Sequence, residues 1–464
     1  MMGGEVNTMQ KKLTNQITQG VIWKQLLLFF FPILLGTFFQ QMYNTVDTII
    51  VGRFVGTEAL AAVGSTGPLI NLINGFFIGL SSGATVILSQ AFGADDRKGV
   101  HSILHTAVAL SLILGLLTTA VGVLAGPQIL RLTQIPENCI EDALTYIRIY
   151  FAGAVASMVY NMGAGILRAM GDSKRPMIFL IIACFVNIVM DLVCVVWLKL
   201  GAAGAALATV LSQIISAILV LVVLMRLPNE QKLEFSHLQL NKNFLGRILQ
   251  IGIPAGLQFI TFDLANVLIQ SSVNSFGDIT IAAWTAIGKT DSLNWMICGA
   301  FGVAITTFVG QNFGAQQYGR VRKSVWVCMA MGIPVVAAVS AIIIPLRSVI
   351  LSIYTEDLAV IAAGAHIMLF TVPFNAIFIP VEVFAGTMRG VGSSLTPTIV
   401  TGSCVCLFRV LWVLLVVSRY HTIEMLAIAY PISWALAGIV FLIVYFRGNW
   451  MKKRILECGM EPET

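Results

Sequence analysis

The chain has 464 residues, of which 57% are hydrophobic and 11% are charged, and its mean hydropathy is +0.88. A soluble domain carries about a quarter charged residues, so this composition excludes a soluble globular domain and predicts an all-α protein that lives in a bilayer. The formal net charge of +6 reflects lysine and arginine residues that gather on one side of the membrane. It therefore gives no reason to expect a nucleic-acid partner.

The first twenty residues are polar and lead into an apolar segment too long for the core of a signal peptide, so we expect no cleaved leader. From there the apolar segments predict twelve transmembrane helices. They are residues 22–50, 58–90, 100–126, 143–166, 176–198, 201–225, 247–274, 279–309, 323–346, 359–385, 396–418 and 425–446. The uncharged stretch from Ala59 to Ala94 exceeds the thickness of the bilayer core, so part of it is expected to tilt or to lie along the interface.

Two phrases recur along the chain. SQAFGADDRK begins at Ser89 and GQNFGAQQYG begins at Gly310, and GILRAMGDSKRP and GTMRGVGSSLTP begin at Gly165 and Gly386, so each pair is 221 residues apart. Lysine and arginine place these loops and both termini in the cytoplasm. The two halves therefore enter the membrane in the same direction, as parallel six-helix repeats, which is an architecture of secondary transporters.

The repeat predicts the domain organisation. We expect an N-terminal six-helix bundle over residues 1–226, a cytoplasmic connector over 227–245 and a C-terminal six-helix bundle over 246–464. The polar connector is long enough to let two rigid bundles move against each other. The arginines of the two repeat loops, Arg168 and Arg389, are expected to anchor helix ends at lipid headgroups.

Acidic residues inside a membrane span are functional candidates because charge is costly there. Five lie well inside the predicted spans: Asp47, Asp191, Asp263, Asp291 and Glu382. At about 1.5 Å per residue, Asp47 lies about 9 Å from the external Arg53, and Asp191 lies about 12 Å from the external Lys199.

Asn187 stands one turn deeper than Asp191, and Thr209 lies about 15 Å from the external surface on the next span. These four oxygen-bearing side chains suit Na⁺, or a proton that two acids share because both cannot ionise cheaply. The alternatives are a carboxylate that caps a broken helix for Asp47, and hydrogen bonding between helices for Asn187 and Thr209.

The first span also carries a polar stripe. Gln40, Asn44 and Asp47 stand at i, i+4 and i+7, on a face that is unsuited to lipid and is expected to line a substrate cavity. Asn161 in the fourth span either faces the same space or has a structural role.

Together these features resemble the multidrug and toxic compound extrusion (MATE) family over nearly the whole chain. The resemblance rests on the twelve spans, the two halves, the spacing from Pro32 to Asp47, the N-x-x-x-D pattern ending at Asp191, Thr209, and the paired loops. It implies V-shaped bundles, rocker-switch alternating access, and export of cationic or amphipathic compounds driven by Na⁺ or H⁺.

In the bacterial branch that the chain most resembles, residues matching Asp47, Asn187, Asp191 and Thr209 form a cation site in the N-terminal bundle. Residues matching Gln40 and Asn161 help to line the drug cavity, and Pro32 matches a proline at which the first helix bends. The resemblance implies a multi-pass protein of the bacterial cytoplasmic membrane. We expect a monomer.

The acids of the second half depart from another branch of the family, in which ions are coupled through the seventh and tenth spans, because Asp263 and Glu382 are each displaced from those positions. By the predicted topology Lys289, Asp291 and Arg409 are buried, so they are expected to pair with opposite charges on other helices, and contact with the substrate is the alternative. Glu382 and Asp263 are candidate partners for Arg409.

Other chemistry is not predicted. His101 and His105 lack the glutamate of a zinc motif, no phosphate-binding loop occurs, and no arrangement of residues recommends an enzyme. We therefore expect no cofactor other than the coupling ion. The prediction is an ion-coupled exporter of drugs and toxic compounds. A flippase for lipid-linked headgroups, which would need several cavity arginines and lysines, and a passive channel or receptor remain as alternatives.

Overall fold

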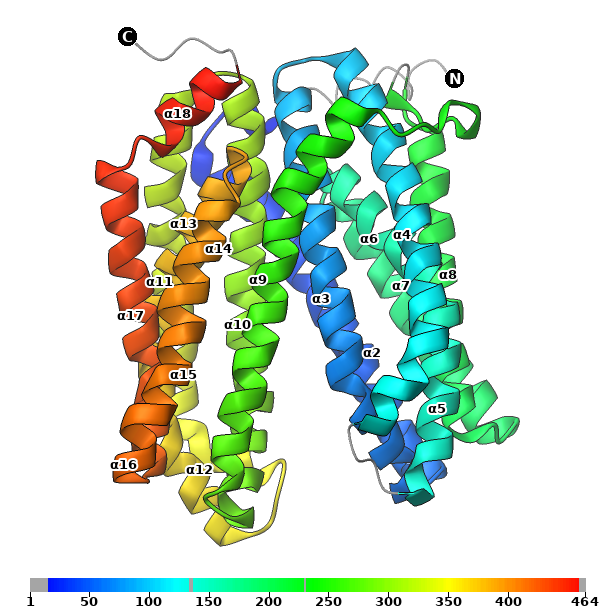
Figure 1. The fold of residues 1–464 in the computed structure, drawn as a ribbon, viewed down its shortest axis with the longest axis vertical. Helices are drawn as coiled ribbons and strands as arrows, with labels where there is room; N and C mark the ends of the chain where they lie inside the picture. The colour runs from blue at the N-terminus through cyan, green and yellow to red at the C-terminus, as the bar shows by residue number, and fades with distance from the viewer. Residues whose placement is uncertain (1–15, 133–136, 229–230, 459–464) are drawn as a thin grey trace. The chain divides into compact units, whose positions relative to one another are not determined.

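The computed structural model describes residues 16–132, 137–228 and 231–458, and these residues form helices and connecting loops with no strand (Figure 1). The long helices of the first half are α2 (Ile22–Phe54), α3 (Thr57–Gly93), α4 (Arg97–Leu132), α5 (Glu137–Ala152), α6 (Ala154–Ala169), α7 (Lys174–Asp191) and α8 (Gly201–Met225). Those of the second half are α9 (Lys242–Asn274), α10 (Asp278–Gly314), α11 (Tyr318–Ser352), α12 (Leu358–Thr371), α13 (Phe378–Gly390) and α17 (Ile423–Arg447). Shorter α-helices are α14 (Leu395–Thr401), α15 (Phe408–Trp412), α16 (Ser418–Tyr420) and α18 (Trp450–Glu457).

Among the described residues, the π-helical segments are η2 (Leu192–Trp197), η6 (Gly402–Leu407) and η7 (Val413–Val417). The 3₁₀-helical segments of the described chain include η1 (Gln16–Thr18), η4 (Phe235–His237) and η5 (Val372–Ile377).

Eleven helical spans of the described chain are long and apolar enough to cross a membrane, and the bent pair α5 and α6 makes up to twelve. This confirms the predicted helical membrane fold. The pair bends by 47° at Gly153, where a Cβ would lie 2.6 Å from Val210 of α8. The bend therefore falls where α8 packs too closely for any larger residue. The long second span is one continuous helix, α3, which contains Pro68.

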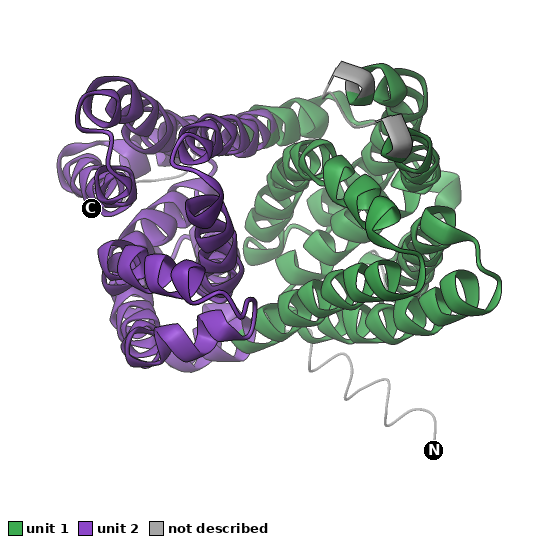
Figure 2. Cartoon of the chain, turned by 90° about the horizontal axis from the view of Figure 1, so that it is seen from below, with its two compact units in different colours: residues 1–16, 31–252 green, residues 17–30, 253–464 purple. Residues whose placement is uncertain are grey.

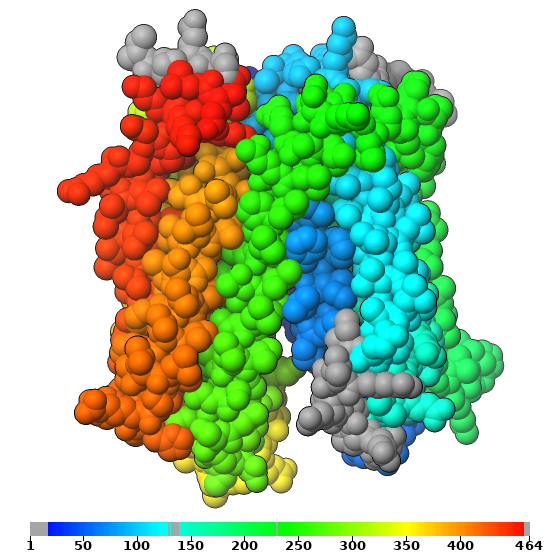
Figure 3. All heavy atoms as spheres, in the orientation of Figure 1, coloured from blue at the N-terminus to red at the C-terminus, as the bar shows by residue number. Residues whose placement is uncertain are grey.

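The outer surface is apolar, as a lipid-facing surface must be. Figure 3 shows one face of the molecule, on which the orange α14–α16 and the red α17 display their side chains. Exposed residues of these segments and η7 include Leu411, Leu414, Leu415 and Ile439, each at least 45% exposed. So many exposed large apolar side chains would be unfavourable in water and indicate contact with lipid.

The structure also shows the internal repeat. Helices α3 and α10 both contain 37 residues and begin 221 positions apart. The loops that follow match in backbone conformation, because Asp95 and Gln316 have φ of 54° and 56°, and Gly171 and Gly392 both have φ of 91°. Matching left-handed residues at a constant offset show that the recurring phrases build the same turns in both halves.

The offset rises to 222 near the end of each repeat, where Lys199 and His421 have φ of 53° and 41°. The extra residue has a structural cause. The second half has two π-helical segments, η6 and η7, whereas the first half has one, η2, and each π-helical turn accommodates one inserted residue. Beyond η6, therefore, Arg409 of the second half corresponds to Asn187 of the first.

The chain divides into two compact units (Figure 2). Unit 1 contains Phe31–Gly252, and unit 2 contains Ile17–Phe30 and Ile253–Thr464. The chain thus passes between units inside α2 and inside α9, each time two residues before a proline, Pro32 or Pro254. The predicted domains end at the connector, and they remain a prediction about which parts move as rigid bodies.

The described part of the connector is attached to unit 1. His105 Nε2 of α4 accepts a hydrogen bond from the Glu234 amide at 3.0 Å. Thr106 Oγ1 contacts the Gln239 carbonyl and the Asn241 amide, both at 3.3 Å. The described part of the connector is therefore held along α4 in this structure.

Within unit 1, α3 and the start of α9 approach so closely that only glycine fits. A Cβ on Gly252 would lie 2.6 Å from the Leu80 carbonyl oxygen, and one on Gly83 would collide with the Ile248 carbonyl. Gly67, on the same helix as Gly83, has no atom within 4 Å of its Cβ position. Small residues let membrane helices pack backbone to backbone.

We expect Gly83→Ala to destabilise the protein by about 1–3 kcal/mol, because the added methyl group must displace backbone. Gly67→Ala should be neutral or stabilising, because alanine is the better helix former. Thermal unfolding of both variants in detergent measures the difference. Equal melting temperatures would show that the α3–α9 approach is looser than described.

Candidate functional site

The four residues of the predicted cation site lie on three helices of unit 1. Asp47 is on α2, Asn187 and Asp191 are on α7, and Thr209 is on α8, which packs along α7. All four are buried, Asn187 and Asp191 with an exposed fraction of 0%. Buried charges in a membrane protein are rare unless they are paired or functional.

Within the described residues, five buried polar atoms of this group have no hydrogen-bond partner. They are Asp47 Oδ1, both side-chain atoms of Asn187 and both carboxyl oxygens of Asp191. Most buried polar atoms in folded proteins are satisfied, so such a cluster requires an ion, a proton or water to complete it.

The two carboxyl groups lie close enough to interact with each other. Two ionised carboxylates at this separation repel each other, and neither can donate a hydrogen bond. A proton on one of them, or a cation between them, converts the repulsion into attraction. This juxtaposition is the central feature of the site.

The local fold explains how Asp191 reaches this position. The π-helical η2 begins directly after Asp191 and is covered by small residues of α8, where a Cβ on Gly204 would lie 3.0 Å from the Cys194 carbonyl. A π-helical turn changes the direction of the side chains around it and often marks a functional site. The site therefore sits where α7 departs from regular α-helical geometry.

Tyrosine side chains surround the two acids, and these tyrosines were not predicted from the sequence. Tyr146 of α5 lies close enough to interact electrostatically with both Asp47 and Asp191. Tyr43, one turn before Asp47, lies close to the side chain of Gln40. Tyr150 stacks on Tyr146 with ring centroids 6.3 Å apart. The sequence signal that could have found these tyrosines is the spacing of Tyr146 and Tyr150, which stand four residues apart in an apolar span.

The donor set suits a monovalent ion. The described residues contain no group of three or more histidine, cysteine, aspartate or glutamate side chains placed to hold a metal. Two carboxylates with neutral oxygens from Asn187 and Thr209 instead provide hard ligands of low total charge. The residues fit Na⁺ or a shared proton, and the ion itself stays a prediction.

The predicted cavity residues differ in environment. Gln40 is half-buried and Asn44 is exposed on α2, whereas the Asn161 amide donates to the Ser157 carbonyl of its own helix at 2.9 Å. Pro32 lies inside the continuous helix α2, beside the passage of the chain from unit 2 to unit 1. The roles of these four residues remain predictions.

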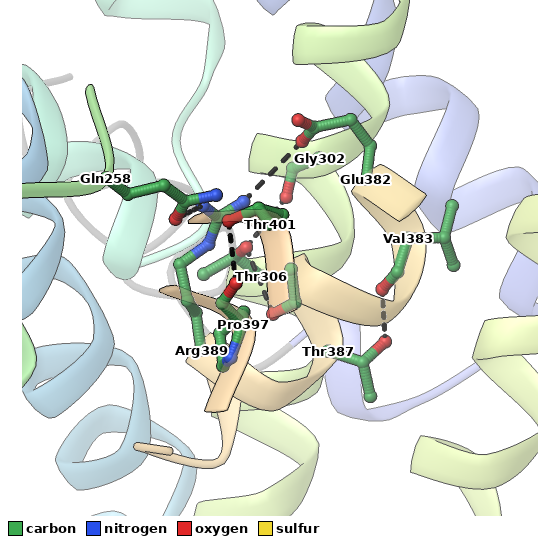
Figure 4. A network of polar contacts seen from close by, with 10 residues as sticks. Gln258, Gly302, Thr306, Glu382, Val383, Thr387, Arg389, Pro397 and Thr401 are labelled. Carbon is green, nitrogen blue, oxygen red and sulfur yellow. Dashed lines mark hydrogen bonds and ion pairs between the residues drawn. The ribbon is translucent and has the colours of Figure 1, made fainter. Parts of the chain in front are cut away.

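In unit 2 the charged residues are not arranged as expected. Lys289 is exposed. Glu382 makes an ion pair with Arg389 at 3.5 Å, and Arg389 also donates to Gln258 Oε1 at 3.4 Å (Figure 4). Glu382 is therefore not the partner of Arg409, and Arg389 is an internal ion-pair residue rather than a headgroup anchor.

The first repeat has no such ion pair at the corresponding place. At the constant offset of 221, Glu382 corresponds to Asn161 and Arg389 corresponds to Arg168. The neutral Asn161 cannot supply a counter-charge, and Arg168 Nε is buried with no hydrogen-bond partner among the described residues. The two repeats share a backbone plan but distribute their charges differently.

A helical membrane protein built from two parallel repeats, with buried acids facing each other in one of them, has the architecture of a secondary transporter. Residues 32–193 and 254–415 each match the MatE family model. The chain therefore belongs to the MatE family, the multidrug and toxic compound extrusion transporters, and is a transporter rather than an enzyme. The two matched segments begin 222 residues apart, at Pro32 and Pro254, in agreement with the internal repeat.

Comparisons with individual relatives agree with this family assignment. The chain is 29% identical to the probable multidrug resistance protein YoeA of Bacillus subtilis over 462 residues, which cover 97% of this chain and 99% of the relative. It is 34% identical to the probable multidrug resistance protein YpnP of the same organism, over 66% of this chain and 68% of that protein. The crystal structure of a MATE transporter in the straight conformation superimposes with a TM-score of 0.88 at 23% identity, over 94% of this chain and 98% of that chain, and shows the shared fold.

Proposed function

We propose that the protein is an antiporter that exports cationic or amphipathic drugs and toxic compounds by rocker-switch alternating access, driven by Na⁺ or H⁺. The observation that carries the proposal is the pair of buried carboxyls, Asp47 and Asp191, that face each other with no donor between them. The names of the relatives, probable multidrug resistance proteins, support the export of drugs.

The physical cycle follows from the charge of the pair. With neither proton nor cation present, the two carboxylates repel, and α2 is pushed from α7. Binding of one positive charge removes the repulsion and draws α2 inwards. Helix α2 packs less closely against its neighbours than the other helices of unit 1 pack against one another, so it can respond at low cost in packing.

Movement of α2 would couple the ion to the substrate. Asn44 and Gln40 lie one and two turns before Asp47 on the same face of α2, so a shift or bend of this helix near Pro32 displaces both. If they line the drug cavity, ion entry from outside lowers the affinity for the drug there. The reset then carries the ion inwards.

The coupling ion is tested by transport under separate gradients. A fluorescent cationic dye is added outside everted vesicles that contain the protein, so that export appears as dye uptake, and an outward Na⁺ gradient or an outward proton gradient is imposed alone. We expect one gradient to drive dye movement and the other to have no effect. Flux that ignores both gradients would instead indicate a passive channel, and movement only of a lipid-linked anionic headgroup would indicate a flippase.

A further inference from the structure

Unit 2 contains a cavity of about 330 Å³ that the proposed coupling cycle does not use. Five aromatic side chains line it, Phe262, Trp284, Trp295, Tyr430 and Trp434. Its volume lies at the lower end of the range for small-molecule pockets, which are lined by apolar and aromatic groups with a few polar groups that set orientation. Two charged residues, Arg409 and Asp291, complete the lining.

Arg409 has an unused hydrogen-bonding edge. Its guanidinium lies 3.9 Å from the centre of the Tyr430 ring, and its Nε donates to Ser433 Oγ at 2.9 Å. Its Nη2 is buried and has no partner, and among the described residues no carboxylate forms an ion pair with it. Arginine donates through a planar fork that suits a carboxylate, and here half of that fork is vacant.

Asp291 has an unused acceptor. The amides of Asn375 and Asn294 both reach its Oδ1, at 3.2 and 3.5 Å. In the described chain its Oδ2 makes no hydrogen bond, and no lysine or arginine pairs with it. Two opposite charges thus border one cavity without neutralising each other, although each would be costly alone in a membrane.

The internal repeat relates this cavity to the proposed substrate path in unit 1. At the offset of 222 between Pro32 and Pro254, the lining residues Phe262 and Asn266 correspond to Gln40 and Asn44. Beyond η6 the same offset relates Arg409 to Asn187. The same part of each repeat therefore lines a site, but the second repeat has Phe262 in place of Gln40 and Arg409 in place of Asn187, and it keeps the amide at Asn266.

We propose that this cavity binds a small aromatic zwitterion. Its carboxylate would accept hydrogen bonds from the free edge of Arg409, its protonated amine would donate to Oδ2 of Asp291, and its ring would pack among the tryptophans and Tyr430. Such a ligand satisfies both charges at once. A singly charged ligand leaves one of them unpaired.

The test is equilibrium binding to the purified full-length protein in detergent, without an ion gradient. The probes are 4-(aminomethyl)benzoate and its two-ring homologue 4′-(aminomethyl)biphenyl-4-carboxylate, together with the analogues that lack the amine or the acid. Calorimetry should show that a zwitterion binds more tightly than either singly charged analogue. Arg409→Gln should weaken binding of the zwitterion and of the analogue that has only the acid about 10- to 100-fold. Binding of the analogue that has only the amine should be unchanged. Asp291→Asn should weaken binding of the zwitterion and of the analogue that has only the amine, and should leave binding of the analogue that has only the acid unchanged.

A second pair of variants keeps the test independent of the buried charges. Gly288 lines the cavity, Gly299 lies further along α10 outside the lining, and neither has an atom within 4 Å of its Cβ position. Gly288→Phe should block binding of the zwitterion, because its ring would fill part of the cavity, and Gly299→Phe should leave that binding unchanged. Asp47→Asn, in unit 1, should leave binding unchanged, which separates this site from the proposed coupling site. Equal binding of charged and neutral probes, or variants that do not discriminate among them, would overturn the proposal.

Discussion

Asp191→Asn is expected to lower gradient-driven dye efflux at least about tenfold, which corresponds to an ordinary coupling free energy between two sites. Asparagine keeps the size of the side chain but cannot carry the negative charge that binds Na⁺ or exchanges a proton. Asp47→Asn should have the same effect, because the charge of the pair is lost when either carboxylate is removed. The readout is dye uptake into everted vesicles under the effective gradient, which corresponds to efflux from the cell, measured beside wild type.

The same variants should fold at least as well as wild type. Replacing one of two facing carboxylates by an amide removes repulsion and supplies a donor to the remaining acid. Asp263→Asn in unit 2, an acid of intermediate exposure outside the predicted site, is the matched control and should retain efflux. Wild-type efflux by both Asp47→Asn and Asp191→Asn would remove the coupling role from this pair.

The ion pair between Glu382 and Arg389 gives the second large expected effect. Arg389→Met should destabilise the protein by about 3–5 kcal/mol, because it leaves Glu382 charged in a largely enclosed place. The two side chains are 22% and 15% exposed, so solvent screening is weak. Gly302 makes room for Glu382, since a Cβ there would collide with Oε2. Thermal or denaturant unfolding in detergent measures the loss.

A double-mutant cycle separates the pair from its surroundings. Glu382→Gln combined with Arg389→Met removes both charges, so the double variant should be more stable than Arg389→Met alone. If the stability lost by the double variant equals the sum of the losses of the two single variants, the two side chains do not interact. The nearby bond from Thr306 Oγ1 to the Gly386 carbonyl, 3.1 Å long, should persist in all variants.

Several predictions from sequence agree with the structure because they depend on local or periodic properties. The membrane spans follow from runs of apolar residues whose length matches the bilayer. The two halves follow from recurring loop phrases, and the paired left-handed residues Asp95 and Gln316 show why the phrases recur. The depth of Asp47 and Asp191, counted along each helix from its external end, is consistent with the contact between their carboxyls.

Charge pairing in unit 2 was predicted less well. Arg409 was expected to pair with Glu382 or Asp263, but Glu382 pairs with Arg389 seven residues later on its own helix. A separation of seven residues places both on one face, so this partner was within reach of sequence reasoning. The stacking of Arg409 on Tyr430 was not, because it depends on how α17 is rotated against α15, which pack together (Figure 1).

Hydropathy, charge bias and repetition along the chain are enough to specify a helical membrane transporter made of two parallel repeats, because each is a sum over neighbouring residues. Which buried groups meet depends instead on how the helices pack. The π-helical turns that offset Arg409 from its counterpart by one residue, the close approach of α3 and α9, and the cavity beside Asp291 each depend on the rotation and depth of packed helices. A change of one residue in helical register turns a side chain by about 100°, and no local pattern specifies that.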